Sequence, residues 1–174
     1  MEDWIPYGST EYWGLLAVMI FARGMDLLST WIATPNLALE GNPIAKRLGW
    51  KWGGLLNAVI CVWFAAWPMV AIILTTTSLL VAAKNFSVAW HMRSAGEEDY
   101  RAWYFRQLSQ TPLSLYLFCL GGQTALTALV GAALVFFSSE LIPVAIGFGI
   151  IAYAAAVASF TLLSIWRWRT LMRV

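Results

Sequence analysis

The chain has 174 residues, of which 60% are hydrophobic and only 11% are charged. A soluble domain has about 45–50% apolar and about 25% charged residues, so this chain has too few polar side chains to cover a surface that faces water. This composition excludes a soluble enzyme, a disordered chain and a coiled coil. The formal net charge is only +2, and no basic run interleaved with aromatic residues indicates a nucleic-acid partner. We therefore predict an all-α integral membrane protein, a single helical bundle over residues 1–174 whose partner is the lipid bilayer.

Four apolar stretches are long enough to cross a bilayer, which takes about 20 helical residues. Only Ser138, Ser139 and Glu140 separate the last two stretches, so these should form a tight antiparallel hairpin. The four predicted transmembrane helices cover about residues 13–33, 53–80, 112–137 and 141–166.

Short interfacial helices should accompany the spans, over about 43–50 and 81–110. We interpret the run from 53 onward as one long helix that crosses the bilayer, can bend at Pro68 and continues outside as an amphipathic helix. Ser94 and Glu97 have the spacing of a capping box, which predicts that a further helix begins there.

Lysine and arginine orient the chain, because they are enriched in cytoplasmic loops. With four spans and the N-terminus inside, seven of these residues are cytoplasmic and three, Lys46, Arg47 and Lys51, lie outside. Five spans, with a hairpin near residues 75–77, would place all ten on one side and satisfy the rule better. Such a hairpin has no turn residues and buries Lys84 and Asn85 in a span. We therefore predict four spans, with five as the alternative, and cytoplasmic N- and C-termini.

Ionisable side chains are expensive inside a span, so an intramembrane carboxylate is a functional hypothesis by default. Asp26 lies near the middle of the first span, and Arg23 and Thr30 share its helix face at i−3 and i+4. On one interpretation the Arg23–Asp26 pair neutralises itself and packs this helix against a neighbour. On the other, Asp26 binds a proton, a cation or a polar ligand, and Arg23 tunes it.

A second polar cluster follows the first span. Asn42 before Pro43 is typical of a helix start, with Asn as N-cap and Pro at the first position. Glu40 is either solvated, or the loop folds back over the bundle so that Glu40 and Asn42 meet Asp26 or Asn57. Carboxylate and carboxamide oxygens suit a hard cation or a proton better than a soft metal. The candidate ligand-binding residues are Arg23, Asp26, Thr30, Glu40, Asn42 and Asn57.

The run Asp26-Leu-Leu-Ser-Thr30, followed by Glu40-Gly-Asn-Pro43, resembles a group of uncharacterised small prokaryotic multi-pass membrane proteins. These share an Asp-x3-Thr span followed by Glu-x-Asn-Pro, and the match covers about residues 23–57. The group has no assigned activity. The resemblance therefore implies a prokaryotic inner (cytoplasmic) membrane and marks residues, but it implies no function.

Other motifs of known chemistry are absent from the sequence. His91 is the single histidine and the two cysteines lie in apolar runs, which gives no metal-ligand spacing. No nucleophile arrangement or cofactor motif appears, so the cofactor stays unknown. Small residues in the last two spans are expected to let helices pack closely. They include Gly121, Gly122, Gly131, Gly147 and Gly149.

Three functions fit these observations. The first, which we favour, is a protein that binds or transports a proton or small cation, working as a homo-oligomer because four spans are few for a pore. The second is a non-catalytic accessory subunit of a larger membrane complex. The third is a membrane-embedded enzyme acting on a lipid or isoprenoid, with Asp26 and Glu40 as acid and base.

Overall fold

The computed structural model describes residues 4–171, and these residues form six helices and no strand. Four of the helices, α1, α3, α5 and α6, are long and apolar enough to cross a membrane, as the sequence predicts. The helices are α1 (Thr10–Ala33), α2 (Pro43–Phe64), α3 (Pro68–Ala95), α4 (Glu97–Gln110), α5 (Leu113–Phe137) and α6 (Leu141–Leu171).

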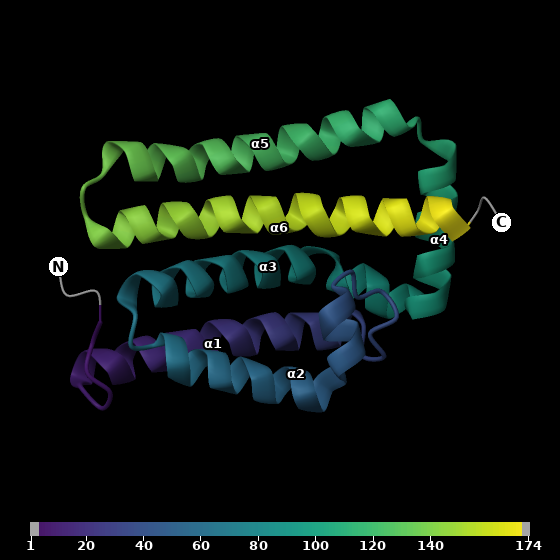
Figure 1. The fold of residues 1–174 in the computed structure, drawn as a ribbon. Helices are drawn as coiled ribbons and strands as arrows, with labels where there is room; N and C mark the ends of the chain where they lie inside the picture. The colour runs from purple at the N-terminus through teal and green to yellow at the C-terminus, as the bar shows by residue number, and fades with distance from the viewer. Residues whose placement is uncertain (1–3, 172–174) are drawn as a thin grey trace.

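Helices α1, α2, α3, α5 and α6 lie side by side, and along the chain these five alternate in direction, so that α3 runs parallel to α1 and antiparallel to α2 (Figure 1). α3 packs against α1 and α6, whereas α6 is the one long helix among those described on which α5 packs. α4 crosses one end of the bundle and connects α3 to α5 (Figure 1). The polar residues of α1 therefore face α3, and α5 keeps most of its surface for lipid or a partner.

The prediction of one continuous helix over 53–80 is wrong. α2 ends at Phe64, α3 begins at Pro68, and the chain reverses direction in between (Figure 1). Proline disfavours helical geometry in the residue before it, and Trp67 is accordingly extended, with φ −121° and ψ 90°. Ala65 and Ala66 are fully buried, because their small side chains let the turn pack against the start of α1. The second candidate span is therefore α3.

This reversal changes the placement of the chain ends. The start of α1 and the end of α6 lie at opposite ends of the bundle (Figure 1). The sequence predicts both termini on one side, which requires an even number of crossings. Along the bundle the described chain makes five antiparallel passes, because α2, which is not one of the four candidate spans, returns beside α1.

Glycines at two contacts of α6 confirm the predicted close packing. A Cβ on Gly147 would lie 2.6 Å from the carbonyl oxygen of Gly131 in α5, and a Cβ on Gly149 would lie 2.7 Å from Thr76 in α3. Both separations are too short for a side chain, so only glycine allows these backbones to approach. Gly121 and Gly122 do not fit the prediction, because no atom lies within 4 Å of either position.

The helix starts follow the sequence in one place and depart from it in another. Asn42 caps α2 as predicted: its Oδ1 accepts from the backbone N–H of Ile44 at 3.0 Å, with Pro43 at the first position. The predicted capping box at Ser94 is wrong, because Ser94 lies inside α3. Gly96, with φ 85°, ends α3 and begins α4, a conformation that glycine adopts readily. The Glu97 side chain therefore takes no part in a capping box and can bind another segment of the chain.

Candidate functional site

A polar seam joins α1 to α3. Arg23 Nη1 donates a hydrogen bond to Ser78 Oγ at 3.0 Å, and Ser78 is buried. Two turns further on, Asn85 Nδ2 donates to Ser29 Oγ at 3.3 Å and to Thr30 Oγ1 at 3.2 Å. The predicted polar face of α1 therefore meets polar partners on α3.

The α3 partners were not among the residues that the sequence singled out. From the sequence alone, Asn85 is notable only as a polar side chain that a five-span arrangement would bury in a span. Ser78 and Asn85 are seven residues apart, a spacing that puts both on one helix face. That spacing is the sequence signal that could have paired them with the face of Asp26.

Arg23 and Asp26 form the charged centre of the seam. Arg23 Nη1 lies 3.7 Å from Asp26 Oδ2, and each side chain is 24% exposed. Among the described residues, the Asp26 carboxylate has no hydrogen-bond donor besides this ion pair; the Ser29 hydroxyl donates to the backbone oxygen of Asp26 at 2.9 Å. Arg23 Nε is buried and has no hydrogen-bond partner among the described residues. The described residues therefore leave part of the hydrogen-bonding capacity of Arg23 and Asp26 unused.

Besides α1 and α3, helix α2 also contributes to the surroundings of Arg23 and Asp26. Cys61 is buried and lies close enough to Arg23 for the charge of the guanidinium to act on its thiol. Met19, one turn before Arg23 on α1, packs in the same core cluster as Cys61 and Ala71. Helices α1, α2 and α3 therefore all contribute to the surroundings of Arg23.

Glu40 lies near the seam but makes its direct bond locally. Its Oε1 accepts from the backbone N–H of Asn42 at 2.7 Å, which shapes the turn before α2. The charge of Glu40 acts on Asp26 more weakly than the charge of Arg23 does. In the described chain no hydrogen bond or ion pair joins the two carboxylates. Glu40 and Asp26 therefore interact only through the repulsion of their charges.

Two of the candidate residues bond elsewhere. The Asn42 side chain caps α2, accepting from Ile44 N and, at 3.5 Å, from Ala45 N. Asn57 Nδ2 donates to the carbonyl oxygen of Gly53 at 2.7 Å, one turn back in its own helix. The structure thus groups Arg23, Asp26 and Thr30 on one seam with Glu40 nearby, and it gives Asn42 and Asn57 local structural bonds.

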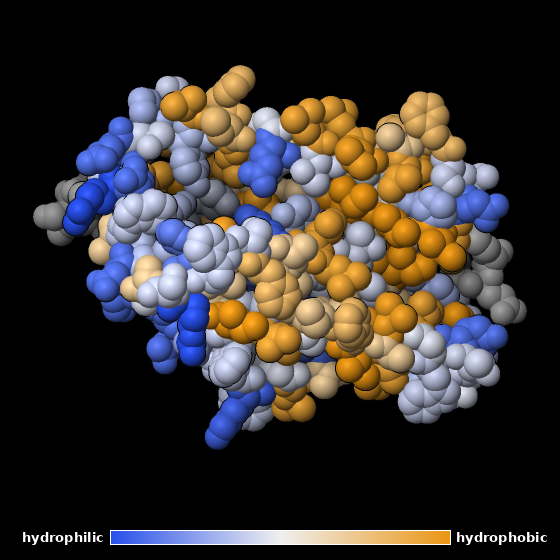
Figure 2. Space-filling view, turned by 180° about the vertical axis from the view of Figure 1, so that it is seen from behind, coloured by the Kyte–Doolittle hydropathy of each residue, from blue (hydrophilic) through white to orange (hydrophobic). Residues whose placement is uncertain are grey.

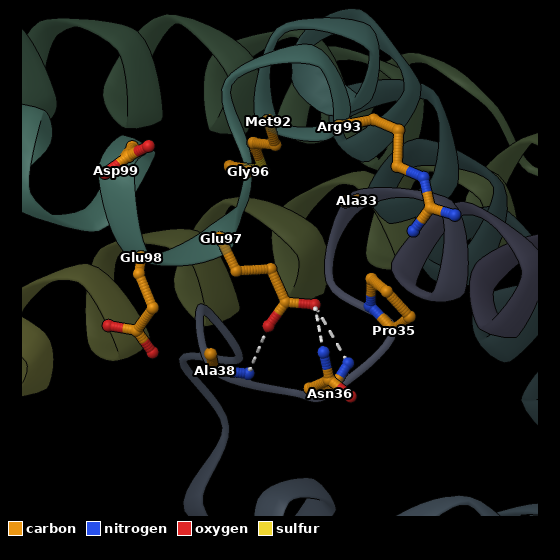
Figure 3. A pocket seen from close by; sticks show the side chains of 10 residues that line it. All are labelled: Ala33, Pro35, Asn36, Ala38, Met92, Arg93, Gly96, Glu97, Glu98 and Asp99. Atoms are coloured by element: carbon orange, nitrogen blue, oxygen red, sulfur yellow. Dashed lines mark hydrogen bonds between the residues drawn. The ribbon is translucent and has the colours of Figure 1, made fainter.

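The loop that carries Glu40 is fastened by a residue from α4. Glu97 Oε1 accepts from Asn36 N at 2.9 Å and Asn36 Nδ2 at 3.4 Å, and its Oε2 accepts from Ala38 N at 3.3 Å (Figure 3). On the other flank, Trp50 Nε1 donates to the carbonyl oxygen of Pro35 at 2.8 Å. The segment after α1 is therefore tied to both α4 and α2, a contact between distant parts of the chain that the sequence did not reveal.

A cavity of about 630 Å³ opens beside this fastening. It lies between the loop and the junction of α3 with α4, and the charged side chains of Arg93, Glu97, Glu98 and Asp99 line it together with apolar residues (Figure 3). Solvent can therefore approach the loop from this end of the bundle.

Comparison of the chain with protein-family models, with curated proteins and with solved structures finds no match. The similarity of residues 23–57 to small prokaryotic membrane proteins stays a prediction for that reason. What the chain does has to be argued from the geometry around Arg23 and Asp26.

Proposed function

We propose that this membrane protein binds a proton or a small monovalent cation at Asp26 and Glu40, and that it transports this ion as a homo-oligomer in a prokaryotic inner membrane. The observation that carries the proposal is the charge of the site. The site has one guanidinium, from Arg23, and two carboxylates: Asp26 is paired with Arg23 at 3.7 Å, and the charge of Glu40 acts more weakly on Asp26. The cluster has a net charge of −1, and one proton or one monovalent cation neutralises it.

The surroundings make this neutralisation favourable. A charge away from water is stabilised only when it is paired or hydrogen-bonded, and Asp26 lies in an apolar helix without a hydrogen-bond donor to its carboxylate among the described residues. The Thr30 hydroxyl and the Asn85 carboxamide lie one turn further along the seam. Oxygen atoms of this kind are the ligands that hard cations accept.

The decisive experiment compares Asp26→Asn with a matched control, Glu140→Gln. Glu140 is a carboxylate in the turn between α5 and α6, far along the chain from the site. The purified proteins are reconstituted in liposomes, and proton, Na⁺ and K⁺ fluxes are measured with internal dyes. Difference infrared spectra during exchange of pH or cation report whether a carboxylate binds the ion. We expect Asp26→Asn to lose the infrared change and the flux, and Glu140→Gln to keep both.

A purely structural ion pair gives a different result. If Arg23 and Asp26 serve packing only, Asp26→Asn lowers the thermal stability and leaves any flux and infrared response as in the wild type. That outcome would overturn the proposed function.

A second candidate, an accessory subunit of a larger membrane complex, is favoured by the outer face of α5. Gly121, Gly122 and Gln123 are exposed there although they lie in a candidate span, and small residues are typical of helix–helix contacts. Native mass spectrometry of protein extracted in mild detergent separates the two candidates. A small multiple of the chain mass supports the homo-oligomer, whereas a much heavier particle with other proteins supports the subunit.

A further inference from the structure

We infer that α2 is a fifth crossing, and that the end of the bundle where α2 begins and α3 ends lies against the anionic headgroups of the cytoplasmic leaflet. The start of α1 then faces the outside. The inference begins with the path of α2. Trp50, near its start, bonds Pro35 just after α1. Near its end, the carbonyl oxygen of Val62 accepts from the Tyr12 hydroxyl at 3.1 Å, at the start of α1. α2 therefore returns along the length of α1.

The surface of α2 beyond its kink suits this path. Gly49, with φ 66°, breaks the helix and separates a short polar first segment, which carries Lys46 and Arg47, from a remainder that is apolar except for Lys51 and Asn57. On that remainder Leu55, Val59 and Trp63 are each at least 55% exposed. Apolar side chains at this exposure are stable against lipid and costly in water, so the remainder of α2 belongs in the hydrocarbon.

Charge is separated between the two ends of the bundle. Apart from Arg23, Asp26 and Lys84, which lie within the long helices, the end that contains α4 carries seven basic and four acidic side chains among those described, a net charge of +3. The other end carries two acidic side chains, Glu11 and Glu140, and no basic one in the described part of the chain. The basic residues at that end are Lys46, Arg47, Lys51, Arg93, Arg101, Arg106 and Arg167.

The same segregation is visible on the surface. Most of the hydrophilic residues gather at one end of the molecule, a broad hydrophobic band follows, and a smaller group of hydrophilic residues lies at the opposite end of the face shown in Figure 2. The elements at the basic end also contact one another, because Glu97 of α4 binds the loop between α1 and α2. A polar end with a net positive charge complements an anionic lipid surface, which attracts Lys and Arg side chains. The positive-inside rule assigns such an end to the cytoplasm.

One consequence concerns access to the ion site and rests on the proposed function. Asp26 lies seven residues before the end of α1, which is about 10 Å at 1.5 Å per residue. The site is thus closer to the basic end, and Glu40 lies in the loop at that end. A cation or proton would reach Asp26 from the cytoplasmic side.

Cysteine labelling in intact bacterial cells tests the topology. The background carries Cys61→Ala and Cys119→Ser, and single cysteines are introduced at exposed positions. Thr10→Cys and Gly41→Cys are the informative variants, since the space around Gly41 is open within 4 Å. With five crossings, a membrane-impermeant maleimide labels Thr10→Cys in intact cells and labels Gly41→Cys only after permeabilisation. With four crossings and a cytoplasmic N-terminus, the pattern is inverted.

Two control positions report the same side in either topology. Ser139→Cys, between α5 and α6, should be labelled in intact cells, and Ser94→Cys, at the end of α3, only after permeabilisation. The inverted pattern at Thr10 and Gly41 would overturn the inference, as would labelling of both from the same side. If the background variant does not accumulate, protease removal of an N-terminal tag from spheroplasts of the otherwise native chain decides the same question. Neither readout depends on ion binding, so this inference and the proposed function can fail separately.

Discussion

The contact between Glu97 and the loop after α1 yields a prediction whose size can be estimated from the structure. In Glu97→Gln, one carboxylate oxygen becomes an NH₂ group, which cannot accept a hydrogen bond. The side chain then loses the acceptor either for Asn36 N, at 2.9 Å, or for Ala38 N, at 3.3 Å, and the remaining bond loses its charge. We therefore expect the loop that carries Glu40 to open more often.

The expected cost is moderate because the contact is partly exposed. A hydrogen bond to a charged group contributes about 1.5–3 kcal/mol when it is well shielded, and solvent reduces this to about 1–2 kcal/mol here. Such a change corresponds to a factor of about 5–30 in an opening equilibrium. Hydrogen–deuterium exchange measures it, since exchange of the amides of Asn36 and Ala38 requires the loop to open.

Glu98→Gln is the matched control for this prediction. Glu98 is the next residue, carries the same charge and also lies in the first turn of α4, so it tests any general effect on the helix dipole. We expect exchange in residues 34–42 to accelerate in Glu97→Gln and to stay as in the wild type in Glu98→Gln. Equal rates in the two variants would refute the role assigned to Glu97.

Three further predictions concern the packing and capping of the bundle, and thermal unfolding in detergent measures each. Gly147→Ala should lower the stability by about 1–3 kcal/mol, because its Cβ would lie 2.6 Å from a backbone oxygen. The control Gly121→Ala should leave the stability unchanged, because the space around Gly121 is open. Equal losses of stability in the two variants would contradict this packing. Asn85→Ala should cost about 1 kcal/mol, the scale of hydrogen bonds between membrane helices; Asn57→Ala, which removes a bond within one helix, should cost less, and the reverse order would refute the seam. Asn42→Ala should cost about 0.5–2 kcal/mol through loss of the N-cap, and an unchanged melting temperature would contradict it.

Composition and local sequence pattern are sufficient to predict much of this fold. A chain that is 60% hydrophobic, with its apolar residues in long continuous runs, is expected to cross a membrane as helices, because helices satisfy their own backbone hydrogen bonds there. The first span, the tight hairpin of α5 and α6 and the N-cap at Asn42 all depend on residues close together in the chain. For the same reason Arg23, Asp26 and Thr30 could be placed on one face from spacing alone.

The reversal of chain direction between α2 and α3 could not be predicted from local sequence. Residues 64–68 read Phe-Ala-Ala-Trp-Pro, a run without Gly, Asn or Asp that is as compatible with a bent helix as with a turn. Proline at position 68 is allowed both at a kink and at the start of a helix. The difference comes from packing, since α2 and α3 can both contact α1 only when the chain turns back on itself.

The partners of the polar residues depend on the same long-range packing. Asn85 bonds Ser29 and Thr30 across more than fifty residues of sequence, and Glu97 bonds a loop sixty residues before it. A carboxamide or a carboxylate has no local preference strong enough to name such a partner. Local spacing therefore shows which side chains share a helix face, whereas the polar group opposite that face is set by how the helices meet.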